Sequence, residues 1–177
     1  NIEGRGEITQ RDLVKNALRM RPDRIVVGEV RGEEAIDMLQ AMNTGHDGSL
    51  TTIHANTPRD ALTRISTMIQ MAGMRLTAGA INQQIASAVN LVIQVARMSD
   101  GTRRITSISE LNGIKRKELA LHELVRYERL GIDADGRVIG SFRATPGQPK
   151  LAERLEVCGL KLPSSLFDGL FEEAPKK

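Results

Sequence analysis

Cysteine is almost absent from the sequence, which contains only Cys158 among its 177 residues. A single cysteine excludes a disulfide within the chain and is typical of a reducing compartment. Long apolar runs are missing too, since no stretch reaches the roughly 18–20 apolar residues that span a bilayer. The composition therefore points away from a disulfide-stabilised secreted domain and from a membrane-spanning helix.

Aromatic residues are scarce as well, and the excess of positive charge is small. Single-stranded nucleic acids usually stack on aromatic side chains within a clustered basic surface. Here 25 basic residues face 22 acidic ones, and the two signs are interspersed along the chain. We therefore expect no nucleic-acid partner. The four aromatic residues all lie in the last third of the sequence: Tyr127, Phe142, Phe167 and Phe171.

A phosphate-binding loop is the third absence. Such a loop has the pattern G-x-x-x-x-G-K-[ST], in which backbone amides surround the phosphates and the hydroxyl binds magnesium. No lysine in this sequence is followed by serine or threonine. If these residues take part in a nucleotide site, the loop must come from outside the 177 residues.

The most informative stretch that is present runs from Arg24 to Asn56 and is typical of a strand, a helix and a second strand. The apolar run 25–27 shows no polar alternation, which predicts a strand covered on both faces, as in a parallel sheet. That strand ends at Gly28 and Glu29. Because ligands bind beyond the carboxyl ends of the strands in open α/β sheets, Glu29 is a candidate for chemistry.

Two of the three histidines border the second predicted strand, over residues 49–55. His46 follows Gly45, which we expect to end the helix, and His54 shares one strand face with Thr52. A lone histidine or a single carboxylate is more often structural, but these side chains could meet at one sheet edge. Zinc is the competing use, and we do not favour it because the eight-residue spacing fits no compact ligand motif and Cys158 is remote.

Two segments carry a family resemblance: LRMRPDRIVVGEVRG and AMNTGHDGSLTTIHANTP. They resemble the Walker B region and the histidine box of the ATPases of type II and type IV secretion and of type IV pili. The residues of these two segments are most similar to those of the subfamily that assembles tight-adherence (Flp-type) pili. The resemblance covers residues 1 to about 113, and the combination of Gly-Glu, TGH and TTIHAN at this spacing makes it specific.

The resemblance implies residue roles and cofactors, namely ATP and magnesium. Glu29 would be the Walker B acid, acting on magnesium through a bound water and on the attacking water. His46 and His54 would sense the phosphates, and we assign four further residues to cofactor binding: Gly28, Thr44, Gly45 and Thr52. The resemblance places the phosphate loop upstream of Asn1.

At the level of the whole protein, the resemblance implies a hexameric motor in the cytoplasm, peripheral at the inner-membrane face. It would hydrolyse ATP and contact inner-membrane platform proteins of a pilus or secretion system. A second class stays open, because the missing phosphate loop would also fit a non-catalytic interaction or regulatory module derived from the same fold.

The resemblance implies an α/β fold, the C-terminal portion of a RecA-like P-loop NTPase domain, and the remaining pattern predicts a β-hairpin region and short C-terminal helices after it. We expect an ATPase core over residues 1–113, a β-rich extension over 114–145 and a helical tail over 146–177. Threonine caps and apolar periodicity predict helices after Thr9, Thr57 and Thr77. Further strands are expected near the following segments: 90–98, 103–111, 119–129 and 137–142.

Overall fold

The computed structural model describes residues 6–146, 148–163, 166 and 170–172. The chain divides into two compact units, which we treat separately. The first consists of Asn1–Val89 with Ile114–Glu118, and the second of Asn90–Gly113 with Leu119–Lys177. This division rests on contacts within the chain. The domain boundaries that the sequence analysis placed near residues 113 and 145 stay predictions.

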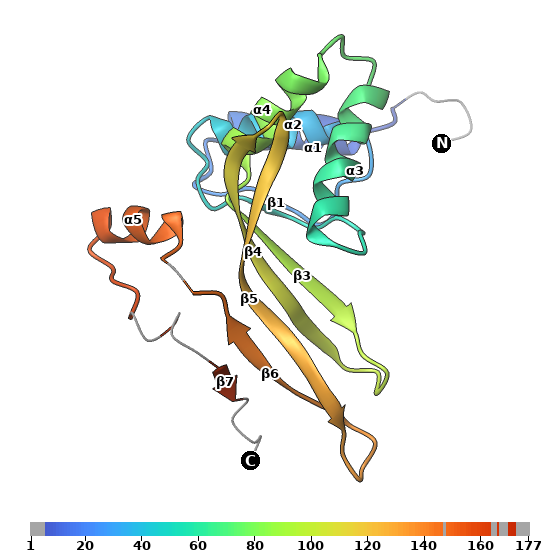
Figure 1. The fold of residues 1–177 in the computed structure, drawn as a ribbon. Helices are drawn as coiled ribbons and strands as arrows, with labels where there is room; N and C mark the ends of the chain where they lie inside the picture. The colour runs from blue at the N-terminus through green and yellow to red at the C-terminus, as the bar shows by residue number, and fades with distance from the viewer. Residues whose placement is uncertain (1–5, 147, 164–165, 167–169, 173–177) are drawn as a thin grey trace. The chain divides into compact units, whose positions relative to one another are not determined.

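Four helices form most of the first unit (Figure 1): α1 (Gln10–Arg19), α2 (Glu34–Asn43), α3 (Pro58–Met71) and α4 (Ala78–Ala88). The three predicted threonine caps are confirmed. Each hydroxyl of Thr9, Thr57 and Thr77 accepts a hydrogen bond from the amide three residues later. Such caps satisfy amides that the first helical turn leaves unpaired, which is why the helix starts could be predicted from the sequence.

Two short strands, β1 (Val26–Val27) and β2 (Leu50–Thr51), pair in parallel, with Val26 opposite Leu50. Two further backbone hydrogen bonds continue the pairing, from Leu50 to the Ile25 carbonyl and from Val30 to the Thr52 carbonyl, both 3.0 Å. Because the strands are parallel, their carboxyl ends lie at the same edge. Glu29 follows the end of β1, as predicted, whereas β2 is shorter than the predicted strand over residues 49–55, so Thr52 follows its end.

The expectation that the first strand is covered on both faces is wrong for this structure. Val27 is 6% exposed, but Val26 is 71% exposed, and Leu50 beside it on β2 is 61% exposed. Burial on both faces needs packed layers on each side of the sheet. The helices of the first unit bury the Val27 face, whereas the Val26 face is open.

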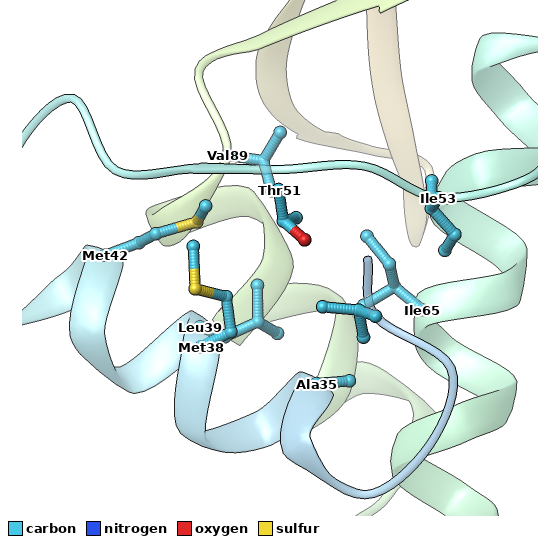
Figure 2. A pocket seen from close by; sticks show the side chains of 9 residues that line it. Ala35, Met38, Leu39, Met42, Thr51, Ile53, Ile65 and Val89 are labelled. Carbon is cyan, nitrogen blue, oxygen red and sulfur yellow. The ribbon is translucent and has the colours of Figure 1, made fainter. Parts of the chain in front are cut away.

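The core of the first unit lies on the Val27 side. Figure 2 shows side chains from α2, α3 and the β2 segment around a cavity. The volume of this cavity is about 30 Å³. The cavity is lined almost wholly by apolar groups, among them Met38, Leu39 and Ile65. Its size, about that of one water molecule, identifies it as a packing gap in the core, too small for a nucleotide.

The second unit is built on a five-stranded sheet with the order β3-β4-β5-β6-β7. The strands are β3 (Leu91–Arg97), β4 (Arg103–Lys115), β5 (Glu118–Ile132), β6 (Val138–Ala144) and β7 (Leu170–Glu172), with helix α5 (Lys150–Val157) before β7. Antiparallel pairing joins β3 to β4, β5 to β6 and β6 to β7. The four predicted strands are therefore present, but residues 170–172 form a strand where the sequence analysis expected a helical tail.

Glu110, on β4, is a buried carboxylate that caps a helix forty residues later. Its oxygens accept hydrogen bonds from the Lys150 amide at 3.0 Å and the Leu151 amide at 2.6 Å. The residue before α5 is Pro149, which offers no side-chain cap. Glu110 thereby satisfies two of the unpaired amides at the start of α5.

Asp100 fixes the turn between β3 and β4 to the start of β6. One oxygen accepts from the Thr102 hydroxyl at 2.6 Å and the Thr102 amide at 2.9 Å, and the other accepts from the Val138 amide at 2.8 Å. The hydroxyl of Thr102, followed by the amides of Val138 and Thr102, lowers the pKa of Asp100 from 3.8 to about 2. These bonds favour the ionised carboxylate.

We expect the stability of the second unit to fall in acid partly through Asp100. A group whose pKa is lower in the folded chain stabilises it above the unfolded pKa, so this contribution is present above about pH 4 and is lost as the pH falls through about 2. Asp100→Asn should lower the melting temperature at pH 6, and its difference from wild type should shrink toward pH 2. A difference that stays constant over this range would contradict the assignment.

Within the described residues, no helix combines the length and the apolar character that crossing a membrane requires.

Candidate functional site

Glu29 lies at the carboxyl end of β1, and both of its carboxylate oxygens have a partner. His54 Nε2 lies 3.0 Å from Oε1. The guanidinium of Arg31 contacts Oε2, with its Nε donating at 2.5 Å. The predicted meeting of Glu29 and His54 therefore occurs in the structure, while Arg31 is a partner that the sequence analysis did not identify.

The charges around Glu29 keep it ionised. The hydrogen bond from Arg31 is the largest cause that lowers the pKa of Glu29, and the charges of Arg31, His54 and Arg64 act in the same direction against partial burial. The side chain of Glu29 is 22% exposed and that of His54 is 83% exposed. The site thus presents an ionised carboxylate that solvent can reach, flanked by the Arg31 guanidinium and the His54 imidazole.

The backbone that carries Glu29 is held from two other segments. The hydroxyl of Thr52 donates to the Gly28 carbonyl. The amide side chain of Gln10, at the start of α1, donates to the Glu29 carbonyl at 2.5 Å. Thr52 and Gly28, both assigned to cofactor binding, therefore lie together beside Glu29, and in this structure their contact is with each other.

His46 contacts the end of α2 and the approach to β2. Its Nδ1 lies 3.2 Å from the Ala41 carbonyl, and its own carbonyl accepts from the Ser49 hydroxyl at 2.7 Å. Thr44 is the C-cap of α2 and donates to the Gln40 carbonyl, and Gly45 follows at φ +90°. Gly45 thus ends the helix in the left-handed region, as predicted.

These contacts divide the predicted site residues into two groups. The first contains Glu29, His54, Thr52 and Gly28, which hydrogen bonds connect at the ends of β1 and β2. The second contains His46, Thr44 and Gly45, whose contacts are with the C-terminal turn of α2. The roles assigned to both groups are proposals about the site with nucleotide bound.

The surroundings of Glu29 suit magnesium held through water better than a metal bound by protein ligands alone. Within the part of the chain that the structure describes, no group of three or more His, Cys, Asp or Glu side chains could hold a metal ion. Magnesium keeps several waters and commonly binds one or two carboxylates together with substrate phosphates. One ionised, accessible carboxylate fits that requirement, and its oxygens have acceptor capacity beyond their present partners.

A surface pocket of about 320 Å³ opens beside the same loop, lined by three loop residues and three from the end of α3: Arg31, Gly32, Glu33, Met68, Met71 and Ala72. Arg31 therefore borders both Glu29 and this pocket. The described residues supply a carboxylate, an imidazole and an arginine, and the sequence has no phosphate-binding loop.

Comparison with known proteins identifies the class. The family described as "Type II/IV secretion system protein" matches residues 1–131. The chain therefore belongs to the type II/IV secretion system protein family. The resemblance inferred from the two sequence segments is confirmed at this level, and the match extends beyond residue 113.

Curated relatives carry names from conjugation and type IV secretion. A putative conjugal transfer protein of Mycobacterium tuberculosis is 43% identical in an alignment of 142 positions that covers 71% of this chain and 40% of that protein. The conjugal transfer protein TrbB of Rhizobium radiobacter is 36% identical over 66% of this chain and 34% of its own length. The type IV secretion system protein VirB11 of Bartonella henselae is 32% identical over 60% of this chain and 30% of its own length.

The fold is similar to a solved structure, the VirB11 ATPase from the Brucella suis type IV secretion system in complex with sulphate. The TM-score is 0.54 at 32% identity, over 58% of this chain and 32% of that one. The chain thus spans about a third to two fifths of the length of these relatives. None of these names refers to tight-adherence pili. The matches therefore support the family but not that particular subfamily.

Proposed function

We propose that this chain forms one side of the nucleotide site of a secretion ATPase, and that the intact protein hydrolyses ATP with magnesium to drive export or pilus assembly. The observation that carries the proposal is the ionised Glu29, held between His54 and Arg31 at the edge where two parallel strands end. The family match and the similarity to a VirB11 ATPase support the same conclusion.

In this mechanism Glu29 orients the attacking water by accepting its hydrogen bond. His54 and Arg31 fix the two carboxylate oxygens, so Glu29 is already oriented before the reaction begins. Bound magnesium supplies positive charge to the phosphate oxygens. His46, at the end of α2, and His54 sense the phosphates, with Thr44, Gly45, Thr52 and Gly28 beside the nucleotide.

The assembly follows from the resemblance. We propose a hexameric ring built on a RecA-like core, cytoplasmic and peripheral at the inner-membrane face, acting on platform proteins there. Tight-adherence pilus assembly is the proposed pathway, and the names of the relatives make conjugal transfer the alternative within the same family. A non-catalytic module is not favoured, because Glu29 and His54 are both present and in contact.

The test is ATP hydrolysis by the intact protein. We expect turnover that requires magnesium and a particle whose mass by light scattering corresponds to six chains. Omitting magnesium in the presence of a chelator serves as the control. Nucleotide binding without any turnover above buffer, by a correctly assembled protein, would contradict the ATPase assignment and favour the non-catalytic alternative.

A further inference from the structure

Glu34, the first residue of α2, makes contacts that the proposed mechanism leaves unused. Its side chain folds back toward the loop that follows Glu29. Oε1 accepts a hydrogen bond from the Arg31 amide at 2.7 Å and a second from the Gly32 amide at 3.1 Å. A side chain of α2 therefore holds the backbone of the residue whose guanidinium contacts Glu29.

Glu34 is buried, whereas the neighbouring residue Glu33 is exposed. Glu34 is 6% exposed, whereas the side chain of Glu33 is 48% exposed and pairs with Arg11. A buried carboxylate is unfavourable unless hydrogen bonds compensate its lost hydration. Glu33, at the N-cap of α2, makes no side-chain capping bond. The same two hydrogen bonds therefore compensate the lost hydration of Glu34 and satisfy two amides of the loop.

The position of Arg31 links Glu34 to the candidate acid. The Arg31 guanidinium reaches Glu29 Oε2 from a backbone that Glu34 fixes at its amide. If that backbone moves, the planar guanidinium loses its geometry toward the carboxylate, because Arg pairs through a rigid fork of donors. The contact between Arg31 and Glu29 thus depends on a residue whose hydrogen bonds go to the loop backbone.

We propose that Glu34 is a positioning residue for the Glu29 site, holding the Arg31 backbone so that Arg31 orients Glu29. The inference rests on the proposed function, since it assumes that Glu29 acts in hydrolysis. Both hydrogen bonds end on the same oxygen, so glutamine at this position can accept them both through its own Oε1. The positioning role therefore predicts that the hydrogen-bonding oxygen matters and the negative charge does not.

The experiment compares Glu34→Ala, Glu34→Gln and the matched control Glu33→Ala in the intact protein. Hydrogen exchange by mass spectrometry, on a peptide that covers residues 31 and 32, reports the amides directly. We expect exchange roughly tenfold faster or more in Glu34→Ala and close to wild type in the other two. Steady-state kinetics should show kcat lowered roughly ten- to hundredfold in Glu34→Ala, with little change in the KM for ATP.

The pH dependence gives a readout that simple loss of stability would not change. Arg31 is the main cause that lowers the pKa of Glu29, so releasing Arg31 lets that pKa rise. The acid limb of the kcat profile should therefore move to higher pH in Glu34→Ala and stay in place in Glu34→Gln. A melting temperature for each variant separates these effects from unfolding.

Three outcomes would overturn the positioning role. The first is fast amide exchange in Glu34→Ala with wild-type kcat and pH profile. The second is a Glu34→Gln variant as impaired as Glu34→Ala, which would make the charge the active feature. If Glu34→Ala does not fold, Glu34→Asp replaces it, because its side chain is one methylene shorter and its oxygen lies further from the two amides. Glu34→Asp should then show the same changes in exchange, kcat and pH profile. The third contradicting outcome is a Glu34→Asp variant that behaves like wild type.

The comparison with Glu29→Gln keeps the two proposals separate. An active Glu29→Gln rejects the proposed function itself. An inactive Glu29→Gln beside a Glu34→Ala variant of wild-type behaviour rejects only the role of Glu34.

Discussion

Replacing Glu29 with glutamine should lower ATP hydrolysis by the intact protein by about two orders of magnitude or more, the scale of one acid/base or electrostatic contributor. Glutamine keeps the shape of the side chain but removes its charge. If its carbonyl oxygen faces Arg31, its NH2 group, which can only donate, stands where the other carboxylate oxygen accepts. Nucleotide binding should stay near wild type, because most contacts to the triphosphate come from a phosphate loop.

The measurement is steady-state turnover beside a titration with Mg-ATP. Glu33→Gln provides the matched control, since it makes the same chemical change four residues further on, at a side chain that is exposed and paired with Arg11. The control should hydrolyse ATP at close to the wild-type rate. Turnover of Glu29→Gln within twofold of wild type would remove Glu29 from the mechanism.

The second large effect concerns Gly140 on β6, in the other unit. A Cβ at this position would lie 2.4 Å from the Glu128 carbonyl oxygen and 2.5 Å from the Tyr127 ring, both on the paired strand β5. Real Cβ atoms do not approach that closely, and the carbonyl belongs to a strand that cannot shift without breaking the ladder. We expect Gly140→Ala to destabilise the second unit by about 2–3 kcal/mol, the upper part of the usual range for overpacking.

Gly131→Ala is the matched control for that variant. Gly131 lies on β5, opposite Ile139, and a Cβ there would meet only that side chain at 3.9 Å, an ordinary contact. Urea unfolding followed by circular dichroism should give a lower midpoint for Gly140→Ala than for Gly131→Ala. Equal midpoints would show that the β5–β6 pair relaxes around the added methyl group.

Local signals in the sequence predicted the helices of the first unit well. Thr9, Thr57 and Thr77 each act within three residues, so their effect is readable without knowledge of the fold. The coverage of β1 was not readable in this way. An apolar run reports that a strand can be buried, but which face another layer covers depends on the tertiary structure, and Val26 is exposed.

The candidate site shows the same limit. Glu29 and His54 could be predicted because parallel strands bring their carboxyl ends to one edge. Gln10 reaches the Glu29 carbonyl across nineteen residues, a contact that spacing cannot predict. Arg31 and Glu34 were closer to prediction, since an acidic residue at the start of a helix three positions after an arginine is visible in the sequence. The hydrogen-bond partners of Arg31 and Glu34 depend on the conformation of the loop between β1 and α2, which the sequence pattern does not give.

The cap that Glu110 provides for α5 has a consequence for the order of folding. A helix of eight residues has too few hydrogen bonds to offset its nucleation on its own. The acceptor for its first amides belongs to a strand forty residues earlier, so α5 gains that stabilisation only after β4 has taken its place in the sheet. In a refolding experiment, protection of the Lys150 and Leu151 amides from exchange should therefore appear after protection of β4, which makes α5 a kinetic reporter of sheet assembly.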